Sequence, residues 1–229
     1  MPGRGAESPR QAAARDKRRR ILEAAVTVFA KDGFANAKVA AIAKKAGVAD
    51  GTIYLYFPSK EALLLTLFEE LCGEFLEEAK ALLKGVDDPR KRLALLASMH
   101  LERLAANRDL AVVFQIELRQ GMQRLTQIAK SRLGSYLRLI RDIIAEGQGR
   151  GLMRADLDPI VGAHIVFGSL DALITSWVLS GQPKDLQGLG ETLATTLFQG
   201  MGSRTSPINK ATKAGTPRSR EESRSHDHA

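Results

Sequence analysis

Side chains that carry covalent or metal chemistry are scarce in this 229-residue chain. The single cysteine, Cys72, cannot form a disulfide within the chain, which suits a reducing compartment and predicts a cytoplasmic location. His100 and His164 stand alone in helical patterns, and His226 and His228 lie near the C-terminus, so none has neighbours at metal-ligand spacing. We therefore expect no catalytic residues, no metal and no cofactor, and we expect His100 and His164 to be satisfied structural histidines.

Long apolar runs are also missing. No run of about 18 consecutive apolar residues occurs, which is the length a membrane-spanning helix needs. The first fifteen residues, MPGRGAESPRQAAAR, contain no hydrophobic segment of the kind that a secretion signal requires. These absences predict a protein without a membrane span or a membrane partner.

Alternating β-branched segments, which would indicate strands, are almost absent. The chain is 44% hydrophobic, and its apolar residues recur at helical spacing in long alanine- and leucine-rich segments. The length is sufficient for a substantial core. We therefore predict an all-α fold with an N-terminal three-helix DNA-binding domain and a C-terminal helical domain for ligand binding and dimerisation.

Positive charge is concentrated at the N-terminus. Residues 1–60 contain 12 Lys or Arg against 5 Asp or Glu, whereas residues 61–202 contain 16 against 18 and residues 203–229 contain 6 against 3. A local basic excess is what binding to phosphates requires, although it could equally serve solubility alone. Charge by itself does not decide between these alternatives.

The segment from residue 39 to residue 57, VAAIAKKAGVADGTIYLYF, has the pattern of a helix-turn-helix. Val39, Ile42 and Ala46 give the first helix an apolar face, and Gly47 follows where the helix must end. The second helix keeps small and hydrogen-bonding residues on its outer side, as entry into a DNA major groove requires. Together with the local charge, this pattern favours nucleic-acid binding.

Cap signals divide the rest of the chain into further helices. We expect Asn36 to cap the first helix of the motif, Ser59 to cap a long helix, and Asp88-Pro89 and Asp158-Pro159 to open two more. The predicted helices outside the motif cover residues 16–31, 60–85, 89–106, 109–119, 122–147, 160–181 and 184–201. The helix from residue 160 is apolar nearly all round, so we expect it to be buried on every side.

These helices suggest four parts of the chain. The predicted boundaries are a flexible basic arm over residues 1–14, the DNA-binding domain over 15–75 with its motif at about 38–57, the ligand-binding and dimerisation domain over 76–201, and a disordered tail over 202–229. The long helix from residue 60 would reach from one domain into the other and so act as a lever.

The segments AAVTVFAKDGF and IAKKAGVADGTIYLYFPSKEALL resemble the TetR family of transcriptional regulators. The resemblance covers about residues 15–200. It implies a homodimeric repressor that reads the two halves of a near-palindromic double-stranded operator and binds an inducer in its body. Ala37 and Lys38 depart from the pattern, because many members carry two hydroxyl residues there; Lys38 could replace the lost phosphate contact with a charged one.

Two further segments, IELRQ at residues 116–120 and FGSLDALITSWV at residues 167–178, resemble the acyl-CoA-responsive repressors of fatty-acid degradation within that family. This resemblance implies release from the operator by a long-chain acyl-CoA. Two alternatives stay open: a TetR-type regulator that responds to a drug or other apolar molecule, as in efflux control, and a ligand-independent DNA-binding helical module.

The residues expected to bind DNA lie on the second helix of the motif and beside it. Thr52 and the Gly51 backbone are expected to approach the groove closely, and Tyr54 and Tyr56 to reach phosphates or bases, although both tyrosines could instead be core residues with hydrated hydroxyls. Asp50 could cap this helix instead of contacting DNA. The complete set is Lys38, Ala49, Asp50, Gly51, Thr52, Tyr54, Tyr56 and Lys60, with the basic cluster at residues 17–20 adding charge.

The residues expected to bind the effector lie on the helices of the body. About half of them should be ordinary core, because an apolar stripe at helical spacing is more often core than pocket lining. Arg119 could contact a ligand phosphate or pair with an acid. The complete set is Met99, Arg103, Val113, Phe114, Arg119, Gln120, Tyr136, Leu137, Ile140, Phe167, Ile174 and Trp177.

Overall fold

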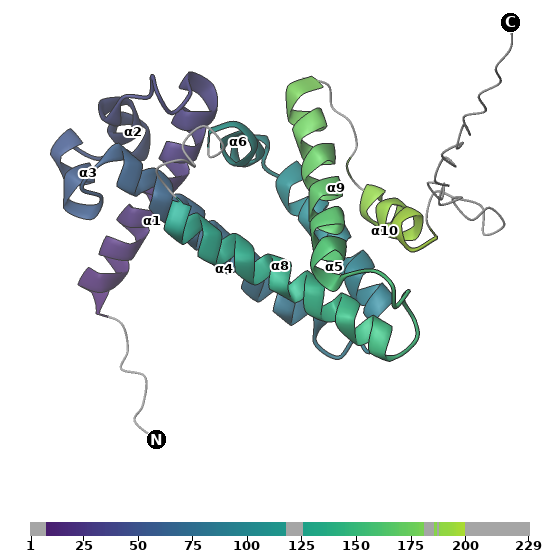
Figure 1. Cartoon of the computed structure of the whole chain (residues 1–229). Coiled ribbons are helices and arrows are strands. Elements are labelled where there is room, and N and C mark those ends of the chain that lie inside the picture. Colours follow the sequence, from purple (N-terminus) through teal and green to yellow (C-terminus); the bar gives the residue numbers. More distant parts are fainter. Residues whose placement is uncertain (1–7, 118–125, 181–185, 187, 200–229) are drawn as a thin grey trace, which may run out of the picture. The chain divides into compact units, whose positions relative to one another are not determined.

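All regular elements among the residues that the structure describes are helices. The computed structural model describes residues 8–117, 126–180, 186 and 188–199, and the side chains of residues 117 and 126–132 are not among the described features. Figure 1 shows the order of the helices from α1 to α10. The prediction of an all-α fold is confirmed.

The first helix, α1 (Pro9–Asp32), starts earlier than predicted. The Ser8 hydroxyl accepts a hydrogen bond from the Gln11 backbone N–H at 3.3 Å, and the Gln11 side chain accepts one from the Ser8 N–H at 2.9 Å. This capping box, with proline at the first helical position, starts a helix well before Asp16. The prediction of a flexible arm over residues 1–14 is therefore wrong from Pro9 onward.

The helix-turn-helix is formed by α2 (Val39–Ala46) and α3 (Asp50–Tyr56). Gly47 ends α2 in the left-handed conformation with a φ of 66°, where a side chain would be strained. Arg20 of α1 donates a hydrogen bond from Nη1 to the Ala46 carbonyl at 3.2 Å and so holds the turn against α1.

The predicted cap at Asn36 is wrong. Lys38 occupies the position before α2, its backbone is extended, and its side chain makes no capping hydrogen bond. The backbone N–H of Ala37 instead bonds the Gly33 carbonyl at 2.9 Å, so a turn follows α1 and shifts the helix start to Val39.

The next two helices start at their predicted caps. α4 (Lys60–Leu83) begins where the Ser59 hydroxyl accepts from the Ala62 N–H at 3.0 Å. α5 (Pro89–Ala105) begins where an Asp88 carboxylate oxygen accepts from the Arg90 N–H at 2.9 Å. Both cap predictions are confirmed, because each polar side chain satisfies a backbone donor that the helix leaves open.

The predicted helix over residues 109–119 is divided. α6 (Arg108–Val112) passes into a π-helical turn, η1 (Val113–Glu117), and the remainder of the predicted helix lies outside the described residues. Within η1, the buried Gln115 side chain accepts a hydrogen bond from the Thr175 hydroxyl at 2.9 Å. This bond ties the wider π-helical turn to a helix 60 residues further along the chain.

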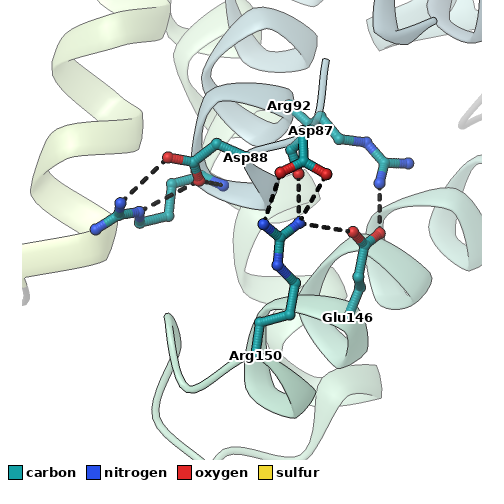
Figure 2. A network of polar contacts seen from close by, with 6 residues as sticks. Asp87, Asp88, Arg92, Glu146 and Arg150 are labelled. Atoms are coloured by element: carbon teal, nitrogen blue, oxygen red, sulfur yellow. Dashed lines mark hydrogen bonds and ion pairs between the residues drawn. The ribbon is translucent and has the colours of Figure 1, made fainter. Parts of the chain in front are cut away.

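Three helices complete the described chain: α8 (Thr126–Gly149), α9 (Pro159–Ser180) and α10 (Leu189–Gln199). Arg150, just after α8, donates to the Asp87 carboxylate at 2.7 Å and to Glu146 at 3.3 Å, and Glu146 also pairs with Arg92 of α5 (Figure 2). These ion pairs hold the loop between α4 and α5 against the end of α8. Because most of these groups are accessible to solvent, water screens their charges and each pair adds little to the stability of the fold.

α9 corrects the prediction that it is buried on every side. Its Leu170 and Ile174 are buried, but Ile165 is 46% exposed and Leu179 is 69% exposed, so the helix is not buried on every side within one chain. With a mean hydropathy of 1.4 over 18 residues, it is also the one described helix that is long and apolar enough to cross a membrane. The sequence pattern hid this property because Asp171 and several small polar residues interrupt the apolar residues. α9 does not contradict the prediction of no membrane span, because a core helix of a soluble protein can be as long and as apolar.

Two hydrophobic clusters form the core, and α4 contributes to both. The first contains Leu63, Leu64 and Leu67 of α4 together with residues of α1, α2, α3, α5, α6 and α9. The second contains Ala79 and Leu83 of the same helix with residues of α5, α8 and α9. α4 therefore connects the helix-turn-helix with the helical body (Figure 1). The predicted domain boundary at residue 75 falls inside this helix and stays a prediction.

Candidate functional site

The outer side of α3 is an open surface. Ile53 and Phe57 are each 2% exposed and anchor α3 in the first cluster, whereas Tyr54 is 55% exposed and Leu55 is 83% exposed. Gly51 belongs to the same outer side, and a Cβ atom placed on it would meet no atom within 4 Å. The fold therefore does not require glycine at this position, and its absent side chain leaves room for another molecule to come close to the helix.

Lys60 fastens the loop between α1 and α2. Its Nζ donates hydrogen bonds to the carbonyl oxygens of Phe34 at 2.6 Å, Ala35 at 3.1 Å and Ala37 at 3.0 Å, and lies 4.7 Å from the centre of the Phe34 ring. An ammonium group has three donors, and all three are used here. Lys38 follows the bonded Ala37 directly and is exposed at the start of α2.

Arg18 connects α1 with α4 and with the end of α3. Its guanidinium pairs with Glu70 of α4 and lies 5.4 Å from the centre of the Phe57 ring. Arg19 pairs with Asp16 and with Glu23, each at 2.7 Å. The Arg19 hydrogen bond lowers the pKa of Asp16 below its ordinary value. Much of the basic cluster at residues 17–20 is thus occupied by neighbouring groups.

In the body, four rings from four helices meet within the second cluster. Phe75 of α4, His100 of α5, Tyr136 of α8 and Phe167 of α9 have ring centres 5.0–6.1 Å apart. His100 Nδ1 and the Tyr136 hydroxyl share a buried hydrogen bond of 3.1 Å. Burial lowers the pKa of His100 to about 4, against a smaller opposing effect of Asp171, and burial raises the pKa of Tyr136. Both side chains are therefore neutral near pH 7.

Comparison with known families accounts for nearly the whole described chain. Residues 21–67 match the model for bacterial regulatory proteins of the tetR family, and residues 68–200 match the C-terminal region of YsiA-like proteins. The chain belongs to the TetR family. Members of this family bind DNA through the helix-turn-helix and are transcription regulators rather than enzymes, so the predictions of DNA binding and of no enzymatic activity are confirmed.

Several relatives of this TetR-family regulator have names that concern fatty acids. The fatty acid metabolism regulator protein of Bacillus subtilis is 39% identical over 187 residues, which cover 82% of this chain and 96% of that protein. The structure of the fatty acid degradation regulator FadR from Bacillus halodurans is 37% identical with a TM-score of 0.79, covering 86% of this chain and 99% of that one. FadR from Bacillus subtilis in complex with stearoyl-CoA is 38% identical with a TM-score of 0.77, covering 80% and 99%. The predicted resemblance to this subgroup is confirmed.

The DNA-binding residues predicted for this TetR-family regulator differ in how far they are exposed to solvent. Lys38, Ala49, Asp50, Gly51 and Tyr54 are exposed, and Thr52 is half-buried. Ala49 occupies the N-cap position, so the interpretation of Asp50 as the cap is wrong; its carboxylate lies in the first turn instead. There it interacts favourably with the positive end of the helix.

Three other residues of this surface lie in distinct surroundings. Tyr56 is partly buried against the first cluster, with its ring centre 6.4 Å from that of Phe57. Of the two tyrosines, Tyr54 is the one that points outward. Backbone carbonyls occupy the donors of the Lys60 ammonium, which points to a structural role, and the expectation that it holds a phosphate stays a prediction. Leu55 was missed, although it lies two residues from Ile53 and Phe57 and so on the opposite side of a helix.

The predicted effector residues divide between the two clusters. Met99, Tyr136, Leu137, Ile140 and Phe167 lie in or against the second, whereas Val113, Phe114, Ile174 and Trp177 lie in or against the first. Arg119 and Gln120 lie outside the described residues. The assignment of all these residues to an effector site stays a prediction.

Three polar residues of the body that the sequence analysis singled out have protein partners. Arg103 pairs with Glu74 at 3.0 Å and with Glu78, so it connects α5 to α4 through two carboxylates. His100 bonds to Tyr136, and His164 Nδ1 lies 2.7 Å from the Ile160 carbonyl oxygen. The prediction that these two histidines are structurally satisfied is confirmed.

Proposed function

We propose that this protein is a cytoplasmic, homodimeric repressor of fatty-acid degradation genes, released from a near-palindromic operator by a long-chain acyl-CoA. The observation that carries the proposal is the position of α4, whose two ends belong to different hydrophobic clusters. The names of the related proteins from Bacillus support the choice of effector.

A long acyl chain has enough apolar surface to change the packing of such a body. Burying sixteen carbons at about 0.8 kcal/mol per methylene provides on the order of 10 kcal/mol before costs. Changing a two-state equilibrium from 1:99 to 99:1 requires only about 5.5 kcal/mol of differential binding. A fraction of the burial energy is therefore sufficient, provided that the chain inserts where α4 meets the body.

The second cluster is where we place the acyl chain. Phe75 of α4 faces His100 and Tyr136, so a chain inserted among these rings displaces α4 from α5 and α8. Arg103 ties α4 to α5 through Glu74 and Glu78, so those ion pairs must break or move with the helix. A shift of α4 changes the position of α3 through Leu63, Leu64 and Leu67, and with it the spacing of two recognition helices.

The exposed side of α9 is our choice for the homodimer interface. Val161, Ile165 and Leu179 recur at spacings that place them along one side of a helix, and each is about half-exposed or more. Gly168 on the same side has nothing within 4 Å of a built Cβ atom, so a second helix could approach closely. Together with α10, this side would pack against its copy as a four-helix arrangement.

Fluorescence anisotropy of the full-length protein on labelled DNA from upstream of its own gene tests the proposal. Palmitoyl-CoA, free palmitate and coenzyme A are titrated separately. Release by palmitoyl-CoA alone is expected. Release by an unrelated apolar drug with indifference to palmitoyl-CoA would instead favour the efflux-type alternative, and indifference to every small molecule would favour a ligand-independent DNA-binding module.

A further inference from the structure

The first three turns of α1, residues 9–20, precede the first core residue, Ile21. They contain six Lys or Arg and one acid, Asp16. The region that matches the N-terminal tetR-family model also begins at residue 21, so these turns extend beyond the common DNA-binding unit. The capping box at Ser8 makes them helical, which holds their side chains in fixed directions.

Contacts of Arg18 and Arg20 show which way this extension faces. Arg18 lies against Phe57 at the end of α3, and Arg20 bonds the Ala46 carbonyl at the end of α2. At about 100° per residue, Arg10 and Lys17 point in nearly the same direction, between those of Arg18 and Arg20. They therefore lie on the side of α1 from which Arg18 and Arg20 contact the helix-turn-helix, further toward the N-terminus.

The side-chain charges of Arg10 and Lys17 are available to bind another molecule. Within the described part of the chain, Arg10 and Lys17 have no hydrogen bond or ion pair from their side chains, in contrast to Arg18, Arg19 and Arg20. Twelve residues at about 1.5 Å each extend roughly 18 Å. At about 3.4 Å per base pair, this length corresponds to the phosphates of about five base pairs.

We propose that Arg10 and Lys17 bind backbone phosphates of the DNA that α3 reads, so that the N-terminal turns of α1 form a second contact outside the helix-turn-helix. Phosphates are the partner because the surface is cationic, is continuous with the reading helix and lacks an apolar patch. The proposal depends on DNA binding and not on the identity of the effector.

The salt dependence of DNA binding tests this contact. The double variant Arg10→Gln with Lys17→Gln is compared with Lys84→Gln with Lys91→Gln, which removes the same charge at exposed positions after α4 and in the first turn of α5. Each lost phosphate contact makes the slope of log affinity against log salt shallower by about 0.9. Because a homodimer carries each substitution twice, the first variant should lose about 3.6 of slope and roughly a thousandfold or more in affinity at 0.1 M salt, and the second should match the wild type.

A charge-retaining variant, Arg10→Lys with Lys17→Arg, should keep the wild-type slope. The contact is refuted if both neutralised variants change the slope equally, if neither does, or if the charge-retaining variant also loses slope. Each variant is also titrated with palmitoyl-CoA on the same DNA. If the variant neutralised at Arg10 and Lys17 keeps the wild-type salt slope while palmitoyl-CoA still releases it from DNA, this contact alone is rejected. If palmitoyl-CoA does not release the wild type from DNA, the proposed effector is rejected and this contact is unaffected.

Discussion

Replacing Lys60 by methionine separates a structural role from a DNA contact at the same position. Methionine keeps most of the apolar length of the side chain and removes the ammonium that bonds the carbonyls of Phe34, Ala35 and Ala37. If Lys60 acts through the loop, the variant is less stable. If it acts on a phosphate, the variant is as stable as the wild type and binds DNA less tightly.

The size of the stability loss follows from the contacts. Three hydrogen bonds at a net value of about 1 kcal/mol each, with a cation–π contact of about 0.5 kcal/mol, would total about 3.5 kcal/mol. The group is half-buried and water can replace part of the bonding, so we expect a decrease of about 2–3 kcal/mol in the free energy of unfolding. A loss of that size is well above the effect of an ordinary surface substitution.

Urea unfolding followed by circular dichroism measures the stability, and anisotropy at several salt concentrations measures the DNA contact. Lys38→Met is the matched control, because Lys38 is exposed beside the same loop and its side chain makes no capping bond. We expect Lys38→Met to keep the wild-type stability and to make the salt slope shallower by about 1.8, which is about 0.9 for each subunit of the homodimer. Our reasoning is refuted if Lys60→Met unfolds at the wild-type urea midpoint and reduces the salt slope as Lys38→Met does.

Three further substitutions test other parts of the argument. Gly51→Ala should keep or raise stability by up to about 1 kcal/mol, since alanine favours helices and meets no atom, yet it should weaken operator binding in anisotropy; unchanged affinity would exclude a close approach at this position. His100 is neutral when folded, with its pKa lowered to about 4, so the unfolded state binds the extra proton and stability should fall as the pH decreases from about 6.5 to 4, by up to about 3 kcal/mol. His100→Gln should remove this part of the pH dependence in urea titrations, and an unaltered pH profile would contradict it. Ile165→Glu should convert a dimer to monomers in sedimentation, whereas Leu82→Glu on α4, a comparably exposed leucine, should not; a dimer that survives Ile165→Glu would exclude this side of α9 as the interface.

Local signals allowed much of the fold to be predicted from the sequence. Ser59 and Asp88 each satisfy a nearby backbone N–H, so their effect depends on residues two or three positions away and can be read from the chain. Gly47 is similar, because its left-handed conformation ends α2 locally. The start of α1 could have been found in the same way, since Ser8, Pro9 and Gln11 form a recognisable cap, but the flanking glycine and arginine residues gave the segment the composition of a flexible arm.

The site could be predicted only in part, because side-chain partners lie far apart in the sequence. Lys60 bonds carbonyls 23–26 residues away, and Arg103 pairs with carboxylates 25 and 29 residues away. Both are cations whose place in the sequence suggests a DNA or ligand contact. The carbonyl and carboxylate groups that accept their hydrogen bonds lie too far along the chain for the local sequence to reveal them. Helical spacing alone predicts that Leu55 is exposed. It was overlooked because DNA contacts are usually expected from polar side chains, not from a leucine.

The packing of α6 adds a constraint on how a ligand could move the helix-turn-helix. Leu110, Ala111 and Val113 of α6 and η1 belong to the same cluster as Ile21 and Phe29 of α1, so the N-terminal helices share a core with the body and are not joined to it by α4 alone. A rotation of α2 and α3 must therefore repack α6 against α1. We expect such repacking at the π-helical turn in η1, because π-helical turns are frequent at functional sites and the Thr175–Gln115 hydrogen bond couples this turn to α9. Hence a signal from the second cluster has two routes to α3: directly along α4, and through α9 and η1 onto α1.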